Sequence, residues 1–254
     1  MSGQALIDNG RFLEALGVEV ELLIGAAHAV PARTPVPTCP GFTVGEIVRH
    51  VGGVFRVAHR WITEGRRPLD WQQNPVPGQS AGDYLRTGLA DLLGELTTHG
   101  PGQFAAGWWP PDRTYGFWSR RMAHETTVHR VDVQGAAGPD IAEIADDLAV
   151  DGVDEVLSVW FGHRLAMLGL SGTTTRSVAV QTGRHTWIAC AGPAETVAWR
   201  CSPAEAGRAD ATVTGSPASV YLWLWGRVGQ HAVTWDGDND AIAQLWALLR
   251  LATR

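Results

Sequence analysis

The chain of 254 residues contains no lysine and few cysteines, and it has no long basic or apolar run. Its 20 basic residues are all arginine, and no more than two are adjacent, as at Arg66-Arg67 and Arg120-Arg121. With a net charge of −6, this scattering argues against a nucleic-acid surface, which would need a clustered positive patch. A small anionic ligand is still compatible with it, because one arginine in a pocket does not change the bulk charge.

The three cysteines, Cys39, Cys190 and Cys201, form neither an even set nor a C-x-x-C pair. This argues against a disulfide framework and excludes a cysteine-rich zinc site. No stretch approaches the roughly 18 consecutive apolar residues of a membrane span, and the first residues lack the basic-then-apolar order of a signal peptide. With 45% hydrophobic and 18% charged residues, the composition is that of a globular protein, and we expect a cytoplasmic one.

Apolar residues at helical spacing dominate the first two-thirds of the chain and predict five helices. The expected ranges are about 4–30, 43–65, 81–98, 115–136 and 141–168. At the second of these, the letters TVGE (43–46) predict a capping box. Loops rich in proline and glycine separate the first four helices, so the segment is expected to form an antiparallel bundle.

The pattern changes near residue 170, where short alternating or β-branched segments predict strands. They are RSVAVQT (176–182), HTWIACA (185–191), ETVAWRC (195–201), ADATVTG (209–215) and HAVTWDG (231–237). Two helices accompany them, one starting at Ser216-Pro217 and one at the end of the chain. This part is predicted to be a second, small α+β domain.

The stretch AHETTVHRVD (123–132) nearly spells the zinc-protease motif His-Glu-x-x-His, but its second histidine comes one residue late. His124 and His129 therefore lie about 140° apart around a helix and cannot share one ion. Glu125 and His129 are four residues apart and share a face, in the stripe expected to point into the bundle. A buried carboxylate there is costly unless it is paired or bound to metal.

Two interpretations of this pair stay open from the residues alone. Glu125 could form a structural pair with His129 or with an arginine such as Arg121. Alternatively, His50, on the flank of the apolar side of helix 43–65, could complete a metal site with them. Two imidazoles and one carboxylate suit Zn²⁺ or another borderline divalent ion, and three protein ligands leave a coordination position open for chemistry. Ordinary core, loop or helix-end roles are expected for His28, His99, His124, His163, His185 and His231.

The letters TCPGFTVGEIVRHVGG followed by RRMAHETTVHRVD resemble the mycothiol-dependent maleylpyruvate isomerase family, part of the DinB-like superfamily of metal-binding bundles. The resemblance implies a four-helix bundle with a metal triad at His50, Glu125 and His129. It also implies a second domain related to sterol-carrier folds, which TGSPASVYLWLWGRV and VTWDGD resemble. We predict an α+β protein with a DinB-like four-helix bundle over residues 1–170 and a small sterol-carrier-like domain over residues 171–254.

The same resemblance implies an activity and its cofactors. In the family, a divalent metal, expected to be Zn²⁺, binds mycothiol, a low-molecular-weight thiol of actinobacteria, and lowers the pKa of its thiol. The thiolate adds to the double bond of maleylpyruvate, the single bond rotates, and elimination gives fumarylpyruvate. The partners expected are therefore a small thiol and a small anionic substrate, with no nucleic acid and no membrane.

Three further residue assignments accompany the resemblance. Arg227, at the end of LWLWGR, is the candidate catalytic residue that binds substrate carboxylates, because arginine offers a bidentate fork. A helix-terminal or surface role would explain that arginine equally well. Trp108 and Trp109 could line the pocket or simply pack, and Cys39 in the TCPG turn is expected to be structural.

Two other functions stay open. On the same scaffold, a metal-activated water could act in a hydrolase that uses no thiol. A regulatory or ligand-binding protein could hold a metal without turnover. The open coordination position favours an enzyme over this last alternative.

Overall fold

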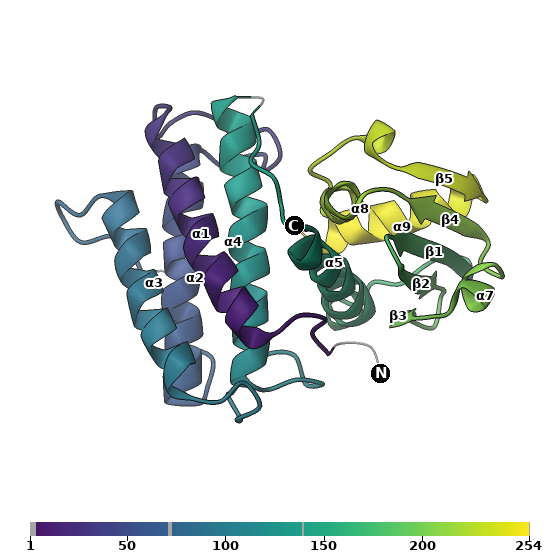
Figure 1. Ribbon diagram of the computed structural model, residues 1–254, viewed down its shortest axis with the longest axis horizontal. Coiled ribbons are helices and arrows are strands. Elements are labelled where there is room, and N and C mark those ends of the chain that lie inside the picture. Colours follow the sequence, from purple (N-terminus) through teal and green to yellow (C-terminus); the bar gives the residue numbers. More distant parts are fainter. Residues whose placement is uncertain (1–3, 71–72, 139, 254) are drawn as a thin grey trace. The chain divides into compact units, whose positions relative to one another are not determined.

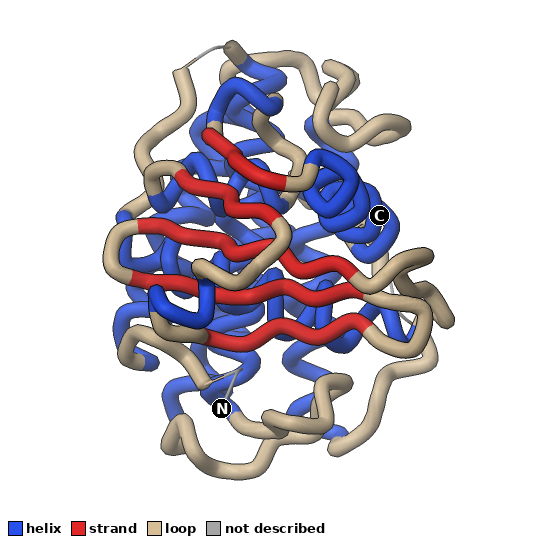
Figure 2. The backbone as a smooth tube through the Cα atoms, turned by 90° about the vertical axis from the view of Figure 1, so that its right-hand side faces the viewer, coloured by secondary structure: helices blue, strands red, loops and turns tan. Residues whose placement is uncertain are grey.

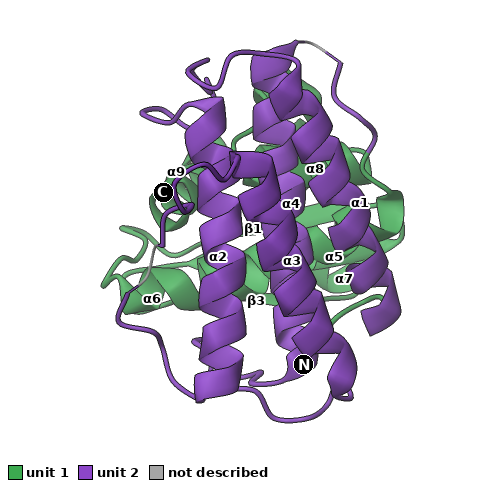
Figure 3. Ribbon diagram, turned by 90° about the vertical axis from the view of Figure 1, so that its left-hand side faces the viewer, with its two compact units in different colours: residues 1–7, 144–254 green, residues 8–143 purple. Residues whose placement is uncertain are grey.

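The computed structural model describes residues 4–70, 73–138 and 140–253, and the chain divides into two compact units (Figures 1 and 3). One unit comprises residues 8–143, and the other comprises residues 1–7 together with 144–254. The predicted boundary at residue 170 differs from this division. The difference arises because the helical segment that begins at Asp146 packs on strand and helix elements of the second unit.

The first unit is a four-helix bundle, as the sequence predicts. Its helices are α1 (Asn9–His28), α2 (Val44–Glu64), α3 (Ala81–Thr98) and α4 (Tyr115–Ala137). α1 packs chiefly on α4 and α2 chiefly on α3, while α2 also contacts α4. The apolar stripes of the four helices meet in a shared core, which includes Leu16, Val20, Val51, Phe55, Leu85, Leu92, Phe117 and Val128.

Side-chain caps determine where three of these helices begin. The predicted capping box at the start of α2 is present: the Thr43 hydroxyl accepts from the Glu46 backbone N–H, and the Glu46 carboxylate accepts from the Thr43 backbone N–H. Ser80 and Thr114 cap α3 and α4 by accepting from backbone N–H groups three residues on. The first residues of α2, α3 and α4 are thereby defined by local hydrogen bonds.

A buried ion pair joins α1 to α4. The Arg130 guanidinium donates to both carboxylate oxygens of Glu19, at 2.6 and 3.2 Å, and also to the Ala142 carbonyl oxygen at 2.6 Å. Arg130 is fully buried, so these bonds replace the water that its charge would otherwise hold. This contact sets the position of α4 within the bundle.

The second unit contains a five-stranded sheet in the order β3-β2-β1-β4-β5 (Figure 2). β1 and β4 are parallel, and the other neighbours are antiparallel. The strands are β1 (Arg176–Thr182), β2 (His185–Ala191), β3 (Thr196–Arg200), β4 (Ala211–Thr214) and β5 (Thr234–Gly237). Their positions confirm the predicted strands, and with the bundle they make the protein α+β.

Helices complete the second unit. They are α5 (Asp146–Glu155), the π-helix η1 (Val156–Arg164), α6 (Leu165–Met167), α7 (Pro203–Ala206), α8 (Pro217–Leu224), the short 3₁₀ helix η2 (Gln230–Ala232) and α9 (Asn239–Ala252). α9 packs along β1, β4 and β2, and η1 packs on β3. Across the described residues, no helix is both long and apolar enough to cross a membrane.

The helix predicted over residues 141–168 differs from the observed one in two respects. It begins at Asp146, where two carboxylates suit the positive end of the helix dipole. From Val156 its hydrogen bonds change to π spacing. The prediction used apolar residues at α-helical spacing only, so it contains no information on a change to π hydrogen bonding.

Gly52, two residues beyond His50 on α2, permits the close approach of α2 to α3. A Cβ at this position would lie 2.7 Å from Tyr84 Cδ1 and 3.3 Å from the Leu85 Cα. Tyr84 cannot easily move aside, because its hydroxyl donates to the Gln73 carbonyl at 2.6 Å and the Arg56 guanidinium lies 3.6 Å above its ring. The absence of a side chain at Gly52 is therefore required by packing.

We predict that Gly52→Ala destabilises the protein by about 1–3 kcal/mol, because the added methyl overpacks the α2–α3 interface. Gly94→Ala is the matched control: this glycine lies in α3 with no atom within 4 Å of a Cβ, and alanine there should stabilise by up to about 1 kcal/mol. Urea unfolding of both variants measures the difference. Equal stabilities for the two variants would contradict the packing role.

Candidate metal centre

Three side chains from two helices meet inside the bundle: His50 from α2, and Glu125 and His129 from α4. The Nε2 atom of His50 lies 3.2 Å from Glu125 Oε1, and the Nε2 atom of His129 lies 3.3 Å from the same oxygen. The two imidazole rings are 5.1 Å apart and nearly perpendicular. Each of the three residues offers one potential ligand atom, and these three atoms lie within 4.8 Å of one another.

The helical register explains why these three residues meet and why His124 does not join them. Glu125 and His129 are one turn apart on the same face of α4. His124 points into the core instead, where it is fully buried with its ring 5.9 Å from that of Phe12 in an edge-on contact. The side chains of the two histidines of the AHETTVHRVD stretch therefore lie in different surroundings, as their spacing predicts.

Glu125 Oε2 and His129 Nδ1, the atoms that do not face each other, contact further polar groups. Arg121, which is buried one turn before Glu125, donates from Nη2 to Glu125 Oε2 at 3.1 Å. The second ring nitrogen of His129, Nδ1, lies 3.0 Å from Asp132 Oδ2. The side chains of His50, Glu125 and His129 remain 20%, 15% and 14% exposed, so the cluster is not fully closed off from solvent.

Electrostatics favour the charged forms of Glu125 and His129. Burial on its own raises the pKa of Glu125, but hydrogen bonds from His129 and His50 and the charge of Arg121 outweigh it, so its pKa lies well below the usual value. Burial likewise opposes a charged His129, yet its contacts with Asp132, Cys39 and Glu125 raise its pKa well above the usual value. The carboxylate is thus ionised, and each imidazole faces it directly.

The arrangement fits a divalent metal ion by its donor chemistry. Two imidazole nitrogens and one carboxylate oxygen converge, which is a donor set that suits zinc. Because Nδ1 of His129 faces a carboxylate, a neutral ring there carries its proton on Nδ1 and its lone pair on Nε2. Both interpretations of the Glu125 pair thus have a physical basis here, since Arg121 and the two histidines all contact the carboxylate.

A second group of potential ligands overlaps the first: Cys39, His129 and Asp132 also lie within 4.8 Å of one another. Hydrogen bonds account for this group. The Cys39 thiol donates to Asp132 Oδ2 at 3.1 Å, and the Thr38 hydroxyl donates to Asp132 Oδ1 at 2.6 Å. The sequence places Asp132 on the face of Glu125 and His129, but these partners come from a turn more than 90 residues earlier and could not be inferred from spacing.

Arg227 lies in the second unit, in the turn that follows α8. Its Nη1 donates to the Trp225 carbonyl at 2.8 Å, and its guanidinium lies 5.8 Å from the Trp225 ring centre. Burial, together with the positive charge of Arg227, lowers the pKa of Arg250 to about 10. Positive charge therefore accumulates at this turn, which suits an anionic ligand. The role of Arg227 as a carboxylate-binding residue stays a prediction.

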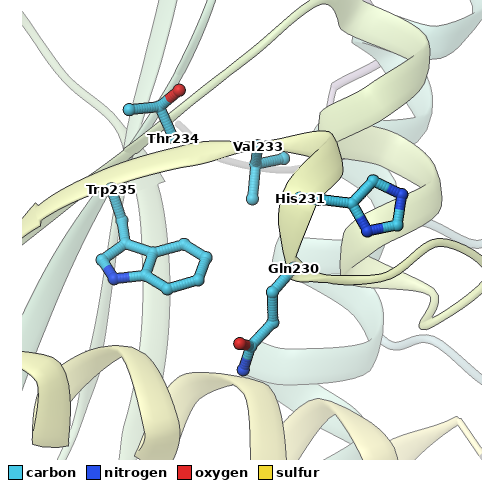
Figure 4. Close-up of a pocket in the computed structure, with 5 residues that line it drawn as sticks. All are labelled: Gln230, His231, Val233, Thr234 and Trp235. Carbon is cyan, nitrogen blue, oxygen red and sulfur yellow. The ribbon is translucent and has the colours of Figure 1, made fainter.

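Trp108, Trp109 and His99 make ring contacts in the structure. Trp109 is buried against Phe117, with their ring centres 5.7 Å apart, and Trp108 makes an edge-on contact with the same ring. His99 stacks on Tyr115 at 4.4 Å. Figure 4 shows an open hollow of the second unit, lined by Gln230, His231, Val233, Thr234 and Trp235, which contains none of the predicted site residues.

The fold and the cluster define a class of protein: an α+β chain with a histidine–glutamate centre in a helical bundle. Family models match both of its parts. Residues 13–134 match the mycothiol maleylpyruvate isomerase N-terminal domain, and residues 147–244 match the corresponding C-terminal domain. The chain belongs to the mycothiol-dependent maleylpyruvate isomerase family.

Similar solved structures include two crystal structures of the mycothiol-dependent maleylpyruvate isomerase, one of them a histidine-to-alanine mutant. Their identities are 14% and 13% and their TM-scores 0.56 and 0.59; each match covers 91% of this chain and 95% of the other. At this identity, the likeness shows a shared fold alone.

A UbiJ-SCP2 ubiquinone synthesis protein is 19% identical over 44% of this chain and 96% of its own, with a TM-score of 0.28. So low a score establishes no shared fold, and the sterol-carrier likeness of the second domain stays a prediction. No curated protein matches the sequence.

We predict that in protein stripped of metal by a chelator, His129 titrates above its ordinary pKa of 6.5, and that Glu125→Gln lowers this pKa. A histidine whose pKa is raised by folding contributes stability at low pH, and this contribution disappears as the pH rises through the folded pKa. Glu125→Gln should therefore reduce the stability that charged His129 adds below pH 6.5, its ordinary pKa, relative to the stability above its folded pKa.

An NMR titration of the imidazole resonances measures this pKa. Glu14→Gln, a change at an exposed carboxylate of α1, is the control and should leave the titration of His129 unchanged. A pKa of His129 at or below its ordinary value would contradict the electrostatic description of the cluster.

Proposed function

We propose that the protein is a metal- and mycothiol-dependent enzyme that isomerises an activated double bond, as maleylpyruvate isomerase does. The observation that carries this proposal is the convergence of His50, Glu125 and His129 from two helices. The Nε2 atoms of His50 and His129 lie 3.2 and 3.3 Å from Glu125 Oε1. Membership of the family supports the choice of thiol and of reaction class.

His50, Glu125 and His129 would hold the ion, and their chemistry favours Zn²⁺. When bound, such an ion supplies Lewis acidity that lowers the pKa of a coordinated thiol, so that a thiolate exists at neutral pH. Glu125 brings one negative charge, and Arg121 offsets part of this charge through its ion pair with Glu125 Oε2. The three side chains are partly exposed to solvent, which is compatible with the approach of a small thiol.

The proposed reaction regenerates the thiol. The thiolate sulfur forms a bond to one alkene carbon, and the displaced electron pair moves onto the conjugated carbonyl. The former double bond is then single and rotates. Return of the electron pair expels the same thiolate and restores the double bond in the trans form, so no other reactant is consumed.

Arg227 is proposed to bind a carboxylate of the substrate. Its planar guanidinium presents paired donors to a carboxylate, and Arg250 beside it adds positive charge to this part of the second unit. Since this role concerns substrate and not metal, its loss should appear in KM.

We predict that the purified protein carries a stoichiometric divalent ion and isomerises an unsaturated dicarboxylate only when a low-molecular-weight thiol is supplied. His50→Ala should lose both the ion and the activity. His59→Ala, on the same helix but outside the cluster, should retain both. Metal analysis by mass spectrometry and an isomerase assay with and without mycothiol measure the two properties.

Other results of these two measurements would indicate one of the alternative functions. Metal-dependent hydrolysis without any thiol requirement would indicate a hydrolase, and bound metal without turnover would indicate a regulatory or ligand-binding protein. A wild-type protein without metal, whose His50→Ala variant is unchanged in stability, would contradict the metal centre itself.

We predict that Arg227→Ala raises KM for the dicarboxylate about 10- to 100-fold, which corresponds to the loss of a charged hydrogen-bonded pair. Arg227→Lys should lie between this variant and the wild type, because an ammonium lacks the bidentate fork. Arg208→Ala, an exposed arginine of the same unit, is the control. Steady-state kinetics of the three variants provide the measurement; an unchanged KM in Arg227→Ala would contradict the role.

A further inference from the structure

Asp132 is a buried carboxylate on α4, one turn after His129. Its Oδ2 lies 3.0 Å from His129 Nδ1 and accepts from the Cys39 thiol at 3.1 Å, while its Oδ1 accepts from the Thr38 hydroxyl at 2.6 Å. We propose that Asp132 is the positioning residue of the metal centre, which orients His129 so that Nε2 faces the ion. This inference rests on the proposed metal centre.

The ring of His129 has two nitrogens, and only one of them can serve the centre. A carboxylate at Nδ1 keeps the proton there, which leaves the lone pair on Nε2, the atom that faces Glu125 Oε1. The hydrogen bond also fixes the rotation of the ring about its bond to Cβ. Without it, the ring could place its proton on Nε2 or turn away, and each change removes a ligand from the centre.

Asp132 is itself held by the turn that precedes α2. Thr38 donates to Oδ1, the oxygen that does not face His129, whereas Cys39 donates to Oδ2, the oxygen that His129 also contacts. The turn that leads into the helix of His50 thereby also supports the ligand helix α4. A purely structural explanation is that Asp132 only anchors this turn, and the experiment has to separate the two roles.

The test compares Asp132→Asn, Asp132→Ala and Thr38→Val in the full-length protein. The zinc dissociation constant is measured by chelator competition, the Co²⁺-substituted absorption spectrum reports coordination, and thermal unfolding reports stability. For Asp132→Ala we expect zinc binding weakened about 10- to 100-fold, with an altered Co²⁺ spectrum. Asp132→Asn should lose less, because its amide oxygen can still accept from His129 while its amide nitrogen donates to Thr38.

Thr38→Val is the matched control, since it removes an anchor of the turn but leaves the contact between Asp132 and His129 intact. We expect it to lower thermal stability while zinc affinity and the Co²⁺ spectrum stay close to those of the wild type. If Asp132→Ala does not fold, the comparison of Asp132→Asn with Thr38→Val decides, and weaker zinc binding in Asp132→Asn supports the positioning role.

Two results would overturn the inference, and they are distinguishable. If the wild type binds zinc and both Asp132 variants bind it equally well with an unchanged Co²⁺ spectrum, Asp132 only anchors the turn while the proposed function stands. If the wild type binds neither zinc nor Co²⁺, the proposed metal centre fails, and the positioning role fails with it.

Discussion

The carboxylate of Glu125 is the group on which the candidate site depends, because it places a negative charge inside a helical bundle. Its ionised form persists only where cations or donors replace water, and here His50, His129 and Arg121 do so. His50 comes from another helix, 75 residues away in sequence, so the same contact that stabilises the charge also joins α2 to α4. The contact between His50 and Glu125 thus contributes both to the packing of α2 on α4 and to the charge of the candidate site.

That interaction constrains the helices on which it lies. The capping box of Thr43 and Glu46 sets the start of α2 and hence the turn on which His50 falls. Gly52, two residues beyond His50, lets α2 approach α3 closely. On α4, the buried pair of Arg130 with Glu19 fixes the helix against α1, one residue after His129. Each ligand therefore lies within a few residues of a contact that determines the position of its own helix.

Much of the fold could be predicted from local signals. The capping residues and the apolar periodicity predicted the helices of the bundle, and the β-branched segments predicted the strands of the sheet. Helical spacing excluded His124 from the candidate site. The π-helix η1 was not predicted, since the apolar residues of this stretch were interpreted at α-helical spacing only. Neither was the division near residue 144, which depends on the packing of α5 against α8. The spacing of Asp132 puts it on the face of Glu125 and His129, but its donors Thr38 and Cys39 lie on a distant turn and could not be predicted.

The two compact units separate the requirements of the proposed reaction. The three candidate ligands and the groups that hold them, Arg121 and Asp132, all belong to residues 8–143. Arg227 and the neighbouring charge of Arg250 belong to the other unit. Metal affinity should then depend on substitutions in the bundle and substrate affinity on those around Arg227. In the proposed reaction no single side chain has to serve both functions, because the candidate metal ligands and Arg227 belong to different units.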